Sequence, residues 1–373
     1  MKILLVSHSQ KIGGAEKCLI ELSHELVRKS YHVTVILPSR AENYKDFLNT
    51  GCEIIVANYT WWVTHTSVNK SCYFWVRKIL SHTKSLFTFN RLISYVKPDY
   101  IISNTIVVPY AAVIAKLKNI SHFWFLHEFG EKDHDLVFDF GIEFSTKLIG
   151  RTSSKVFVNS QVILDYYSNY INQSKLMLVD INVPITELSI SDIKVSSRNL
   201  ELFIIGQFQP QKAQMDGILA HEILLNRGID STLFLIGNTT NTDYVRTLHE
   251  YIDSKLIKNV IFIEQLSNPF SLIKDNGIGL VCSNNEAFGR VTVEFMKLQI
   301  PIVAKASGNN VNLIVDGMNG CLYIPDNINM LVDKILSISS DSRRRHEFTK
   351  SAYLQVKDRF DGESFVNPII NCF

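Results

Sequence analysis

Short apolar runs that alternate with stretches of helical spacing recur along the first half of the chain. Residues 3–7 are apolar without alternation, which is typical of a strand buried on both faces of a parallel sheet. Residues 15–29 carry apolar side chains at helical spacing, and 33–37 form the next predicted strand. Further strands are predicted at 100–103, 123–126 and 155–159. This alternation predicts a doubly wound α/β fold with right-handed crossovers.

The same pattern starts again after residue 200, where a strand is followed by a predicted helix at 216–226. The predicted strands of this half are 202–205, 232–236, 260–263, 277–282 and 302–304. Between the halves, the polar and irregular stretch 180–199 predicts a linker. We therefore expect two Rossmann-like domains that face a central cleft, where ligands bind at the carboxyl ends of the strands.

Composition narrows the class of protein. With 373 residues and a net charge of +2, the chain is long enough for two domains and gives no sign of binding nucleic acid over its whole surface. Its six cysteines are scattered without metal-ligand spacing, which is typical of a reduced, cytoplasmic protein. The first nine residues lack a signal-peptide cleavage site, and no stretch reaches the roughly 18 apolar residues of a spanning helix. We expect a protein that is soluble or lies on a membrane surface.

Residues 282–294 carry the pattern that is most informative about function. The end of a predicted buried strand is followed by Glu286, by Phe288-Gly289, and by a predicted helix that bears Glu294. Eight residues are slightly more than two helical turns, so the two carboxylates are predicted to share one face. Carboxylates accept charge-assisted hydrogen bonds from sugar hydroxyls, and a helix N-terminus offers N–H groups to a diphosphate.

The string Glu286-Ala-Phe-Gly-Arg-Val-Thr-Val-Glu294 resembles the retaining glycosyltransferases of the GT-B fold, specifically glycosyltransferase family 4 (glycosyl transferases group 1). Upstream, Gly206-Gln207-Phe208-Gln209-Pro210-Gln211-Lys212 resembles the phosphate-binding turn of that family. Matching segments also occur at 13–16, 158–160, 301–304, 307–308, 313–317 and 319–320. The resemblance therefore covers nearly the whole chain.

This resemblance implies an acceptor-side domain at 1–182 and a nucleotide-sugar-binding domain at 183–350. Residues 351–373 are expected to form a helical segment that crosses back to the N-terminal domain.

The resemblance also implies roles for individual residues. Glu286 would contact hydroxyls of the transferred sugar, Glu294 the ribose of the nucleotide, and Lys212 the leaving diphosphate. The expected donor-binding residues are Gly206, Gln207, Lys212, Glu286, Phe288, Gly289, Arg290 and Glu294.

Two features of the N-terminal half are assigned to the acceptor side. Gly13 and Gly14 would let the backbone approach the reacting phosphate or acceptor, since glycine has no Cβ to clash. A plain tight turn before a helix is the alternative. His127 ends a predicted strand and is a catalytic candidate together with Glu286 and Lys212, although a hydrogen-bonded core histidine remains an equal interpretation.

No metal or other cofactor is expected, and the nucleotide sugar, with UDP or GDP as its nucleotide, is a substrate. The stretch Asp133-His134-Asp135 matches the metal-binding Asp-x-Asp motif of a different glycosyltransferase architecture, and we assign it no metal.

Two departures from the family pattern bear on the donor. Gln207 stands where many members carry Arg, and Arg290 could supply the missing charge. The common Gly-Gly-x-x-Glu is replaced by Gly308-Asn309-Asn310-Val311-Asn312, in which Asn310 and Asn312 could still hydrogen-bond hydroxyls.

The segment 54–98 contains no Asp or Glu, and its basic residues are interleaved with aromatic ones. Its basic residues are Lys70, Arg77, Lys78, Lys84, Arg91 and Lys97. Such a segment predicts a surface that lies against anionic lipid. Helices with aromatic side chains in the core and solvated charges explain the same pattern, and both interpretations stay open.

We therefore predict a retaining, metal-independent hexosyltransferase that moves a sugar from a nucleoside diphosphate donor to a saccharide acceptor, either soluble or lipid-linked. Its expected context is bacterial surface polysaccharide or glycan synthesis, in the cytoplasm or at the inner face of the cell membrane. A GT-B-type sugar-nucleotide epimerase and an inactive glycosyltransferase-like partner subunit are the alternatives.

Overall fold

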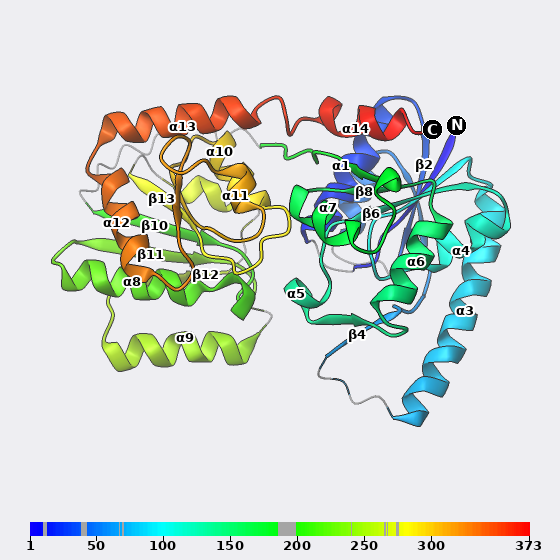
Figure 1. Ribbon diagram of the computed structural model, residues 1–373, viewed down its shortest axis with the longest axis horizontal. Coiled ribbons are helices and arrows are strands. Elements are labelled where there is room, and N and C mark those ends of the chain that lie inside the picture. The colour runs from blue at the N-terminus through cyan, green and yellow to red at the C-terminus, as the bar shows by residue number, and fades with distance from the viewer. Residues whose placement is uncertain are drawn as a thin grey trace. The chain divides into compact units, whose positions relative to one another are not determined.

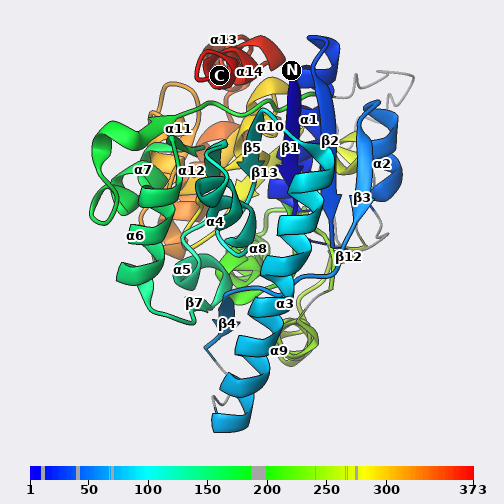
Figure 2. The same cartoon turned by 90° about the vertical axis from the view of Figure 1, so that its right-hand side faces the viewer.

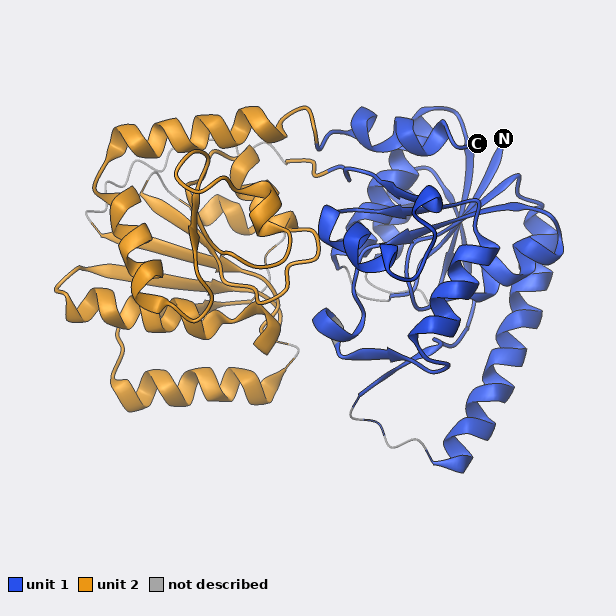
Figure 3. Ribbon diagram, viewed as in Figure 1, with its two compact units in different colours: residues 1–182, 360–373 blue, residues 183–359 orange. Residues whose placement is uncertain are grey.

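The computed structural model describes residues 1–9, 13–38, 43–66, 68, 71–185, 199–239, 241–264, 266, 268–273 and 276–373. These residues form two compact units (Figure 3). Unit 1 comprises Met1–Asn182 together with Phe360–Phe373, and unit 2 comprises Val183–Arg359. Most of the predicted linker, residues 186–198, lies outside the described residues.

Unit 1 is built on a seven-stranded sheet with the order β3-β2-β1-β5-β6-β8-β9, in which every neighbouring pair is parallel. The strands are β1 (Lys2–Val6), β2 (His32–Leu37), β3 (Glu53–Val56), β5 (Tyr100–Ser103), β6 (Ser121–Leu126), β8 (Lys155–Val158) and β9 (Leu176–Leu178). A separate antiparallel pair joins β4 (Val63–His65) to β7 (Leu136–Phe138). The long central strands are almost wholly buried, as their unbroken apolar runs predict.

The helices of unit 1 connect these strands (Figure 1). They are α1 (Gly14–Arg28), α2 (Tyr44–Asn49), α3 (Cys72–Val96), α4 (Tyr110–Leu117), α5 (Glu131–His134), α6 (Ile142–Thr152), α7 (Gln161–Ser168) and α14 (Gly362–Ile370). Helix α14 packs on α1, whereas α4 packs against α3 and α6. Of the predicted C-terminal segment 351–373, residues 360–373 are part of unit 1, where Glu363 pairs with Lys29 at 2.9 Å, and residues 351–359 belong to unit 2.

Unit 2 repeats the design with a six-stranded parallel sheet of order β12-β11-β10-β13-β14-β15. The strands are β10 (Leu200–Ile205), β11 (Ser231–Ile236), β12 (Val260–Ile263), β13 (Gly277–Val281), β14 (Ile302–Lys305) and β15 (Cys321–Tyr323). The helices are α8 (Gln214–Asn226), α9 (Thr242–Lys255), α10 (Arg290–Lys297), α11 (Asn310–Leu313), α12 (Ile328–Ser339) and α13 (Ser342–Val356). The predicted doubly wound α/β fold is confirmed in both units.

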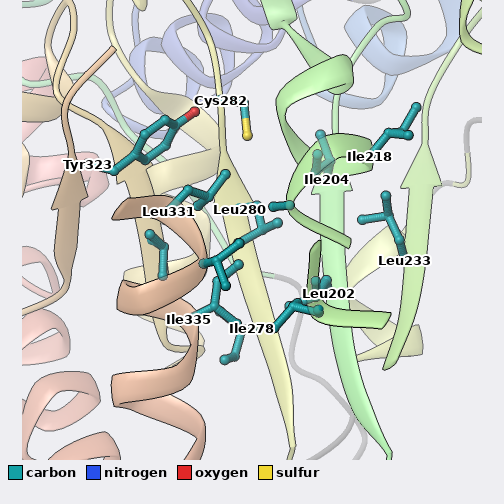
Figure 4. Close-up of a cluster of buried hydrophobic side chains, with 14 of the residues drawn as sticks. Leu202, Ile204, Ile218, Leu233, Ile278, Leu280, Cys282, Tyr323, Leu331 and Ile335 are labelled. Carbon is teal, nitrogen blue, oxygen red and sulfur yellow. The ribbon is translucent and has the colours of Figure 1, made fainter. Parts of the chain in front are cut away.

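The hydrophobic core of unit 2 covers one face of its sheet. Leu202 and Ile204 on β10 lie on one face, because residues two apart in a strand point the same way. Ile278 and Leu280 on β13 join them, and α8 and α12 cover this face with apolar side chains (Figure 4). Cys282 and Tyr323 lie at the end of this cluster where the strands finish (Figure 4). The polar residues Ser283 and Asn284 follow Cys282 at that edge of the sheet.

Within the described residues, no helix combines the length and apolar character needed to cross a bilayer.

Candidate active site

The predicted phosphate-binding turn follows β10 directly. A Cβ on Gly237, which follows β11, would lie 1.9 Å from the Gly206 carbonyl oxygen, so only glycine allows these two strand ends to approach so closely. The chain then makes a 3₁₀ turn at Pro210–Lys212 and enters α8. The Gln214 amide donates to the Gln207 carbonyl oxygen at 2.8 Å, which closes the turn.

At the end of the turn, the ammonium of Lys212 lies 2.9 Å from Oε2 of Glu286. The Glu286 carboxylate also accepts hydrogen bonds from Ser283 and from the Gly289 backbone N–H. Burial by itself would raise the pKa of Glu286, but the charge and hydrogen bonds of Lys212 and the other donors outweigh it, so the pKa is lowered. A cavity of about 20 Å³, with room for about one water molecule, lies beside the pair and is lined in part by Ser283 and Val291.

The second carboxylate of the motif stands on α10. Glu294 is buried, and its Oε1 accepts from Nε of Arg290 at 3.2 Å, an i,i+4 pair on the helix surface. Helix α10 begins at Arg290, and Gly289 before it has φ +89°, a left-handed conformation that favours glycine. Glu286 therefore lies in the loop before the helix, and the expectation that the spacing represents two helical turns was wrong.

The loop with Glu286 rests on the segment that follows β14. A Cβ on Gly308 would lie 2.4 Å from the backbone nitrogen of Glu286, so the two backbones are in direct contact. The Asn309 N–H donates to the Glu286 carbonyl oxygen at 2.7 Å, and its side-chain amide donates to the Phe288 carbonyl oxygen at 2.6 Å. Asn309 thus holds the loop from both sides, a role that the sequence did not suggest.

The two asparagines that were expected to meet sugar hydroxyls differ in their surroundings. Asn310 is fully buried, accepts from Thr292 Oγ1 at 2.9 Å and donates to the Lys305 carbonyl oxygen at 3.3 Å. Its side chain is thus used within the protein, and the expectation that it binds hydroxyls was wrong. Asn312 is exposed and donates to Asn309 Oδ1 at 3.1 Å.

The acceptor-side candidate in unit 1 is deeply buried. His127 follows β6, with Nε2 2.8 Å from Asn104 Oδ1 and Nδ1 3.3 Å from Asn159 Nδ2. Both hydrogen bonds form when Nε2 carries the proton and donates to Asn104, and Nδ1 accepts from the Asn159 amide. Burial, with a further effect of His8, lowers the pKa of His127 to about 3, so the ring is neutral at pH 7. A contact of His127 with a ligand stays a prediction, since both ring nitrogens already have partners.

Next to it lies a carboxyl that sequence reasoning did not single out. Glu128 is 7 % exposed and accepts from the Ile106 N–H at 3.3 Å. Burial raises the pKa of Glu128 to about 7, more than the attraction of His8 lowers it. His8 in turn lies 3.2 Å from Glu16 on α1. The carboxyl edge of this sheet therefore carries acidic and imidazole groups from β1, α1 and β6.

The glycines assigned to the acceptor-side loop begin α1. Gly13 is the N-cap residue with φ −111°, and a Cβ on Gly14 would meet nothing within 4 Å. A Cβ on Gly13 would lie 3.3 Å from Oε2 of Glu16, a tight contact with the end of a side chain. The proposed approach of a ligand to these glycines remains a prediction.

The first aspartate of the Asp-x-Asp stretch forms hydrogen bonds with the backbone that precedes it in the chain. The Asp133 carboxylate accepts from the backbone N–H groups of Phe129 and Gly130 at 2.9 and 2.8 Å and so closes the start of α5. In the described part of the chain, no group of three or more His, Cys, Asp or Glu side chains is placed to hold a metal ion.

Comparison with known proteins identifies the family of the chain and supports its fold. The model for Glycosyltransferase Family 4 matches residues 12–179, and the model for glycosyl transferases group 1 matches residues 188–355. The crystal structure of HepE from Anabaena in complex with UDP and glucose superposes over 100% of this chain and 98% of its own, with a TM-score of 0.78 and 21% identity. Two Rossmann-like units of this kind define the GT-B class of glycosyltransferases. Within that class, the chain belongs to glycosyltransferase family 4.

Curated relatives match parts of the chain. The capsular polysaccharide biosynthesis glycosyltransferase CapM of Staphylococcus aureus is 19% identical over 170 residues, which are 46% of this chain and 44% of that protein. The poly(glycerol-phosphate) alpha-glucosyltransferase of Bacillus subtilis is 24% identical over 175 residues, which are 47% of this chain and 26% of that protein. The chain thus matches less than half the length of both relatives.

The contact between Gly308 and Glu286 can be tested by adding one methyl group. We expect Gly308→Ala to destabilise the protein by about 1–3 kcal/mol beyond the cost of its left-handed backbone, because the backbone of Glu286 must shift. Gly317→Ala is the matched control: Gly317 also has positive φ, but its added Cβ would meet nothing within 4 Å. Equal free energies of unfolding for the two variants, measured with denaturant, would contradict the close contact.

The lowered pKa of Glu286 predicts a pH dependence of stability. Its ionised form is favoured by folding, so this stabilisation is present above the ordinary pKa of 4.5 and is lost as the pH falls through the lower folded value. We expect Glu286→Gln to lower the melting temperature more at pH 7 than at pH 3. The same difference at both pH values would mean that Glu286 is not held as a carboxylate.

Proposed function

We propose that this protein is a retaining hexosyltransferase that uses a UDP-sugar and passes the sugar to a saccharide acceptor. The observation that carries the proposal is the ion pair between Lys212 and Glu286 beside the start of α10. It combines a cation for a diphosphate, a carboxylate for hydroxyls and a helix N-terminus. The names of the relatives support the class of reaction, and the UDP in the HepE structure supports the nucleotide.

In this proposal, donor binding replaces ion pairs within the chain by contacts between the same side chains and the donor. Lys212 leaves Glu286 to neutralise the diphosphate, and Glu286 then accepts from hydroxyls of the sugar. Arg290, which stands at the first position of α10, supplies the second positive charge that the neutral Gln207 does not. Glu294 accepts from the hydroxyls of the ribose. Phe288 is buried beside this loop and fixes its course.

The proposed chemistry needs no covalent sugar–enzyme intermediate. The acceptor hydroxyl attacks the anomeric carbon on the face from which the diphosphate leaves. The bond from that carbon to the phosphate oxygen breaks, the glycosidic bond forms, and the acceptor proton passes to a phosphate oxygen. Lys212 and the N–H groups at the start of α10 stabilise the charge that develops on the leaving group, which is why we propose a metal-independent reaction.

The donor assignment can be tested by replacing Glu294 with Gln. A carboxylate at the ribose makes two charge-assisted hydrogen bonds of roughly 1.5–3 kcal/mol each, so the affinity for UDP is expected to fall at least about tenfold. Titration calorimetry with UDP measures this, and Glu347→Gln on the exposed surface of α13 is the control. Unchanged affinity in Glu294→Gln would remove the ribose assignment.

Turnover of UDP-sugars by the wild-type protein separates the proposal from its alternatives. Mass spectrometry should show a new glycoside only when a saccharide acceptor is present. An epimer of the donor sugar formed without acceptor would instead identify an epimerase, and binding without turnover would identify an inactive partner subunit.

We further propose that the acceptor is lipid-linked and that α3 rests on an anionic membrane, at the inner face of the cell membrane. Many of the exposed residues of α3 recur every three or four positions and so form a stripe along the helix. Its basic and large apolar or aromatic members include Tyr73, Val76, Arg77, Leu80, Lys84, Phe87, Arg91 and Tyr95, and the other exposed residues of α3 are Cys72, Ile79, Thr83, Asn90 and Ser94. The N-terminal turns of α3 extend past the β4–β7 pair in both views of unit 1 (Figures 1 and 2).

Not every basic or aromatic residue of the segment 54–98 belongs to this stripe. Lys78 lies 3.0 Å from Asp139, whose side chain is fully buried, so its charge is used inside unit 1. Trp62 and Phe89 are buried in the core. Lys70 lies outside the described residues. The two interpretations of this segment therefore apply to different side chains, and only the exposed stripe supports the membrane proposal.

Replacing Arg77, Lys84 and Arg91 with Glu should abolish binding to anionic vesicles while the affinity for UDP is retained. Each cation near such a surface contributes about 1 kcal/mol, and the donor residues lie in unit 2. Co-sedimentation at low salt measures the binding, which should weaken as ionic strength rises. Lys17, Lys116 and Lys118, exposed elsewhere in unit 1, are changed to Glu as a charge-matched control. Equal loss in both triple variants, or equal binding of the wild type to neutral vesicles, would contradict the role of α3.

A further inference from the structure

A buried ammonium group lies at the carboxyl end of β14. Lys305 is the last residue of that strand and is 2 % exposed. Its Nζ lies 2.8 Å from Oδ2 of Asp216 and donates to Oδ1 of Asn284 at 2.7 Å. A lysine is rarely buried unless its charge is paired, because transfer of an ammonium from water to a protein interior is costly. The buried ammonium of Lys305 is therefore stabilised by Asp216 and Asn284, and it in turn fixes the positions of their side chains.

The first partner belongs to the helix that follows the phosphate-binding turn. Asp216 lies in the first turn of α8, four residues after Lys212. Its Oδ2 also accepts from the hydroxyl of Tyr323 at the end of β15, at 2.8 Å. The carboxylate is therefore held between two strands of the sheet, which fixes the start of α8 and the turn before it.

The second partner belongs to the loop that carries Glu286. The Asn284 N–H donates to the carbonyl oxygen of Gln211 at 2.9 Å, and its side-chain amide donates to the carbonyl oxygen of Pro210 at 3.4 Å. Asn284 thus ties the loop after β13 to the turn that ends in Lys212. Its side-chain oxygen accepts the hydrogen bond from Lys305.

The backbone of Lys305 extends the same network to α10. Its carbonyl oxygen accepts from the Asn310 amide at 3.3 Å, and Asn310 accepts from Thr292 on α10. One residue at the end of β14 is thereby connected to the turn of Lys212, the loop of Glu286 and the helix of Glu294.

We propose that Lys305 is a positioning residue that sets the separation of Lys212 and Glu286 and thereby the affinity for the diphosphate of the donor. The inference rests on the proposed function of that site. Lys305 itself is too deeply buried to meet the donor, so it acts through Asp216 and Asn284. An ammonium suits this role because it has three donors and can bond to both partners at once.

The experiment compares two ligands that differ in the diphosphate. Affinities for UDP and for uridine are measured by calorimetry or ligand-observed NMR. In Lys305→Met, which keeps the length of the side chain, the affinity for UDP should fall at least tenfold while that for uridine changes less than twofold. The double variant Lys305→Met/Asp216→Asn removes the unpaired buried carboxylate and should show the same selective loss, which guards against a folding defect in the single variant.

Asn284 offers a graded test of the same connection. Asn284→Asp keeps an oxygen for Lys305 and should stay within threefold of the wild type for UDP, whereas Asn284→Leu should lose affinity for UDP and not for uridine. Lys334→Met is the matched control, because Lys334 pairs with Asp316 at 2.7 Å in the same unit without a bond to the turn or the loop. It should leave both affinities unchanged.

The outcomes separate this inference from the proposed function. If the wild type bound neither ligand, the proposed donor would be wrong and the inference with it. If the wild type bound UDP but the Lys305 variants lost UDP and uridine equally, the residue would be a general structural element and the positioning role would be overturned. Wild-type affinity for UDP in Lys305→Met would overturn it as well.

Discussion

The candidate site in unit 2 depends on one ion pair, that of Lys212 and Glu286. The two residues are 74 positions apart in the chain, and each is held at the end of a strand by contacts that leave little freedom. Gly237 lets the turn of Lys212 approach the neighbouring strand, and Gly308 and Asn309 clamp the loop of Glu286. The side chains of Lys212 and Glu286 are 31% and 14% exposed, so loss of either partner would leave a partly buried charge without its counter-ion. In the proposed function, the pair supplies a cation and a carboxylate that are already in place before the donor binds.

The buried carboxyl groups near the strand ends of the two units differ in their surroundings. In unit 2, Glu286 is paired with Lys212 and its pKa is lowered. In unit 1 the neighbouring His127 is neutral, and the pKa of Glu128 is raised to about 7 by burial. Preformed charges suit the stabilisation of a leaving diphosphate. Neutral or titrating groups suit an acceptor hydroxyl, which must approach without a strong ionic competitor.

The sequence predicted the strands and the doubly wound fold because unbroken apolar runs have one main explanation in a parallel sheet. It also singled out Lys212, Glu286 and Glu294 as candidates, since each stands in a short motif, and the structure brings Lys212 and Glu286 together. It could not identify Lys305 or Asn309, because their roles arise from contacts between loops that are distant in the chain. The spacing of Glu286 and Glu294 was misjudged because α10 begins only at Arg290, after Gly289, so Glu286 lies in the loop before the helix. On α3, only the burial of each side chain separates Lys78 from Arg77 and Lys84.

The two departures from the family pattern are best considered together. A neutral Gln207 removes a positive charge from the phosphate-binding turn, and Asn312 removes a negative charge from the segment after β14. The net charge of the site is thus the same as with Arg and Glu at these positions. The buried pair of Lys305 and Asp216 is also neutral as a whole, so it braces the site without altering this balance. Electrostatic attraction for a diphosphate depends on net charge as well as on individual contacts. For the proposed donor, the two substitutions thus change which atoms the site offers while its net charge stays the same.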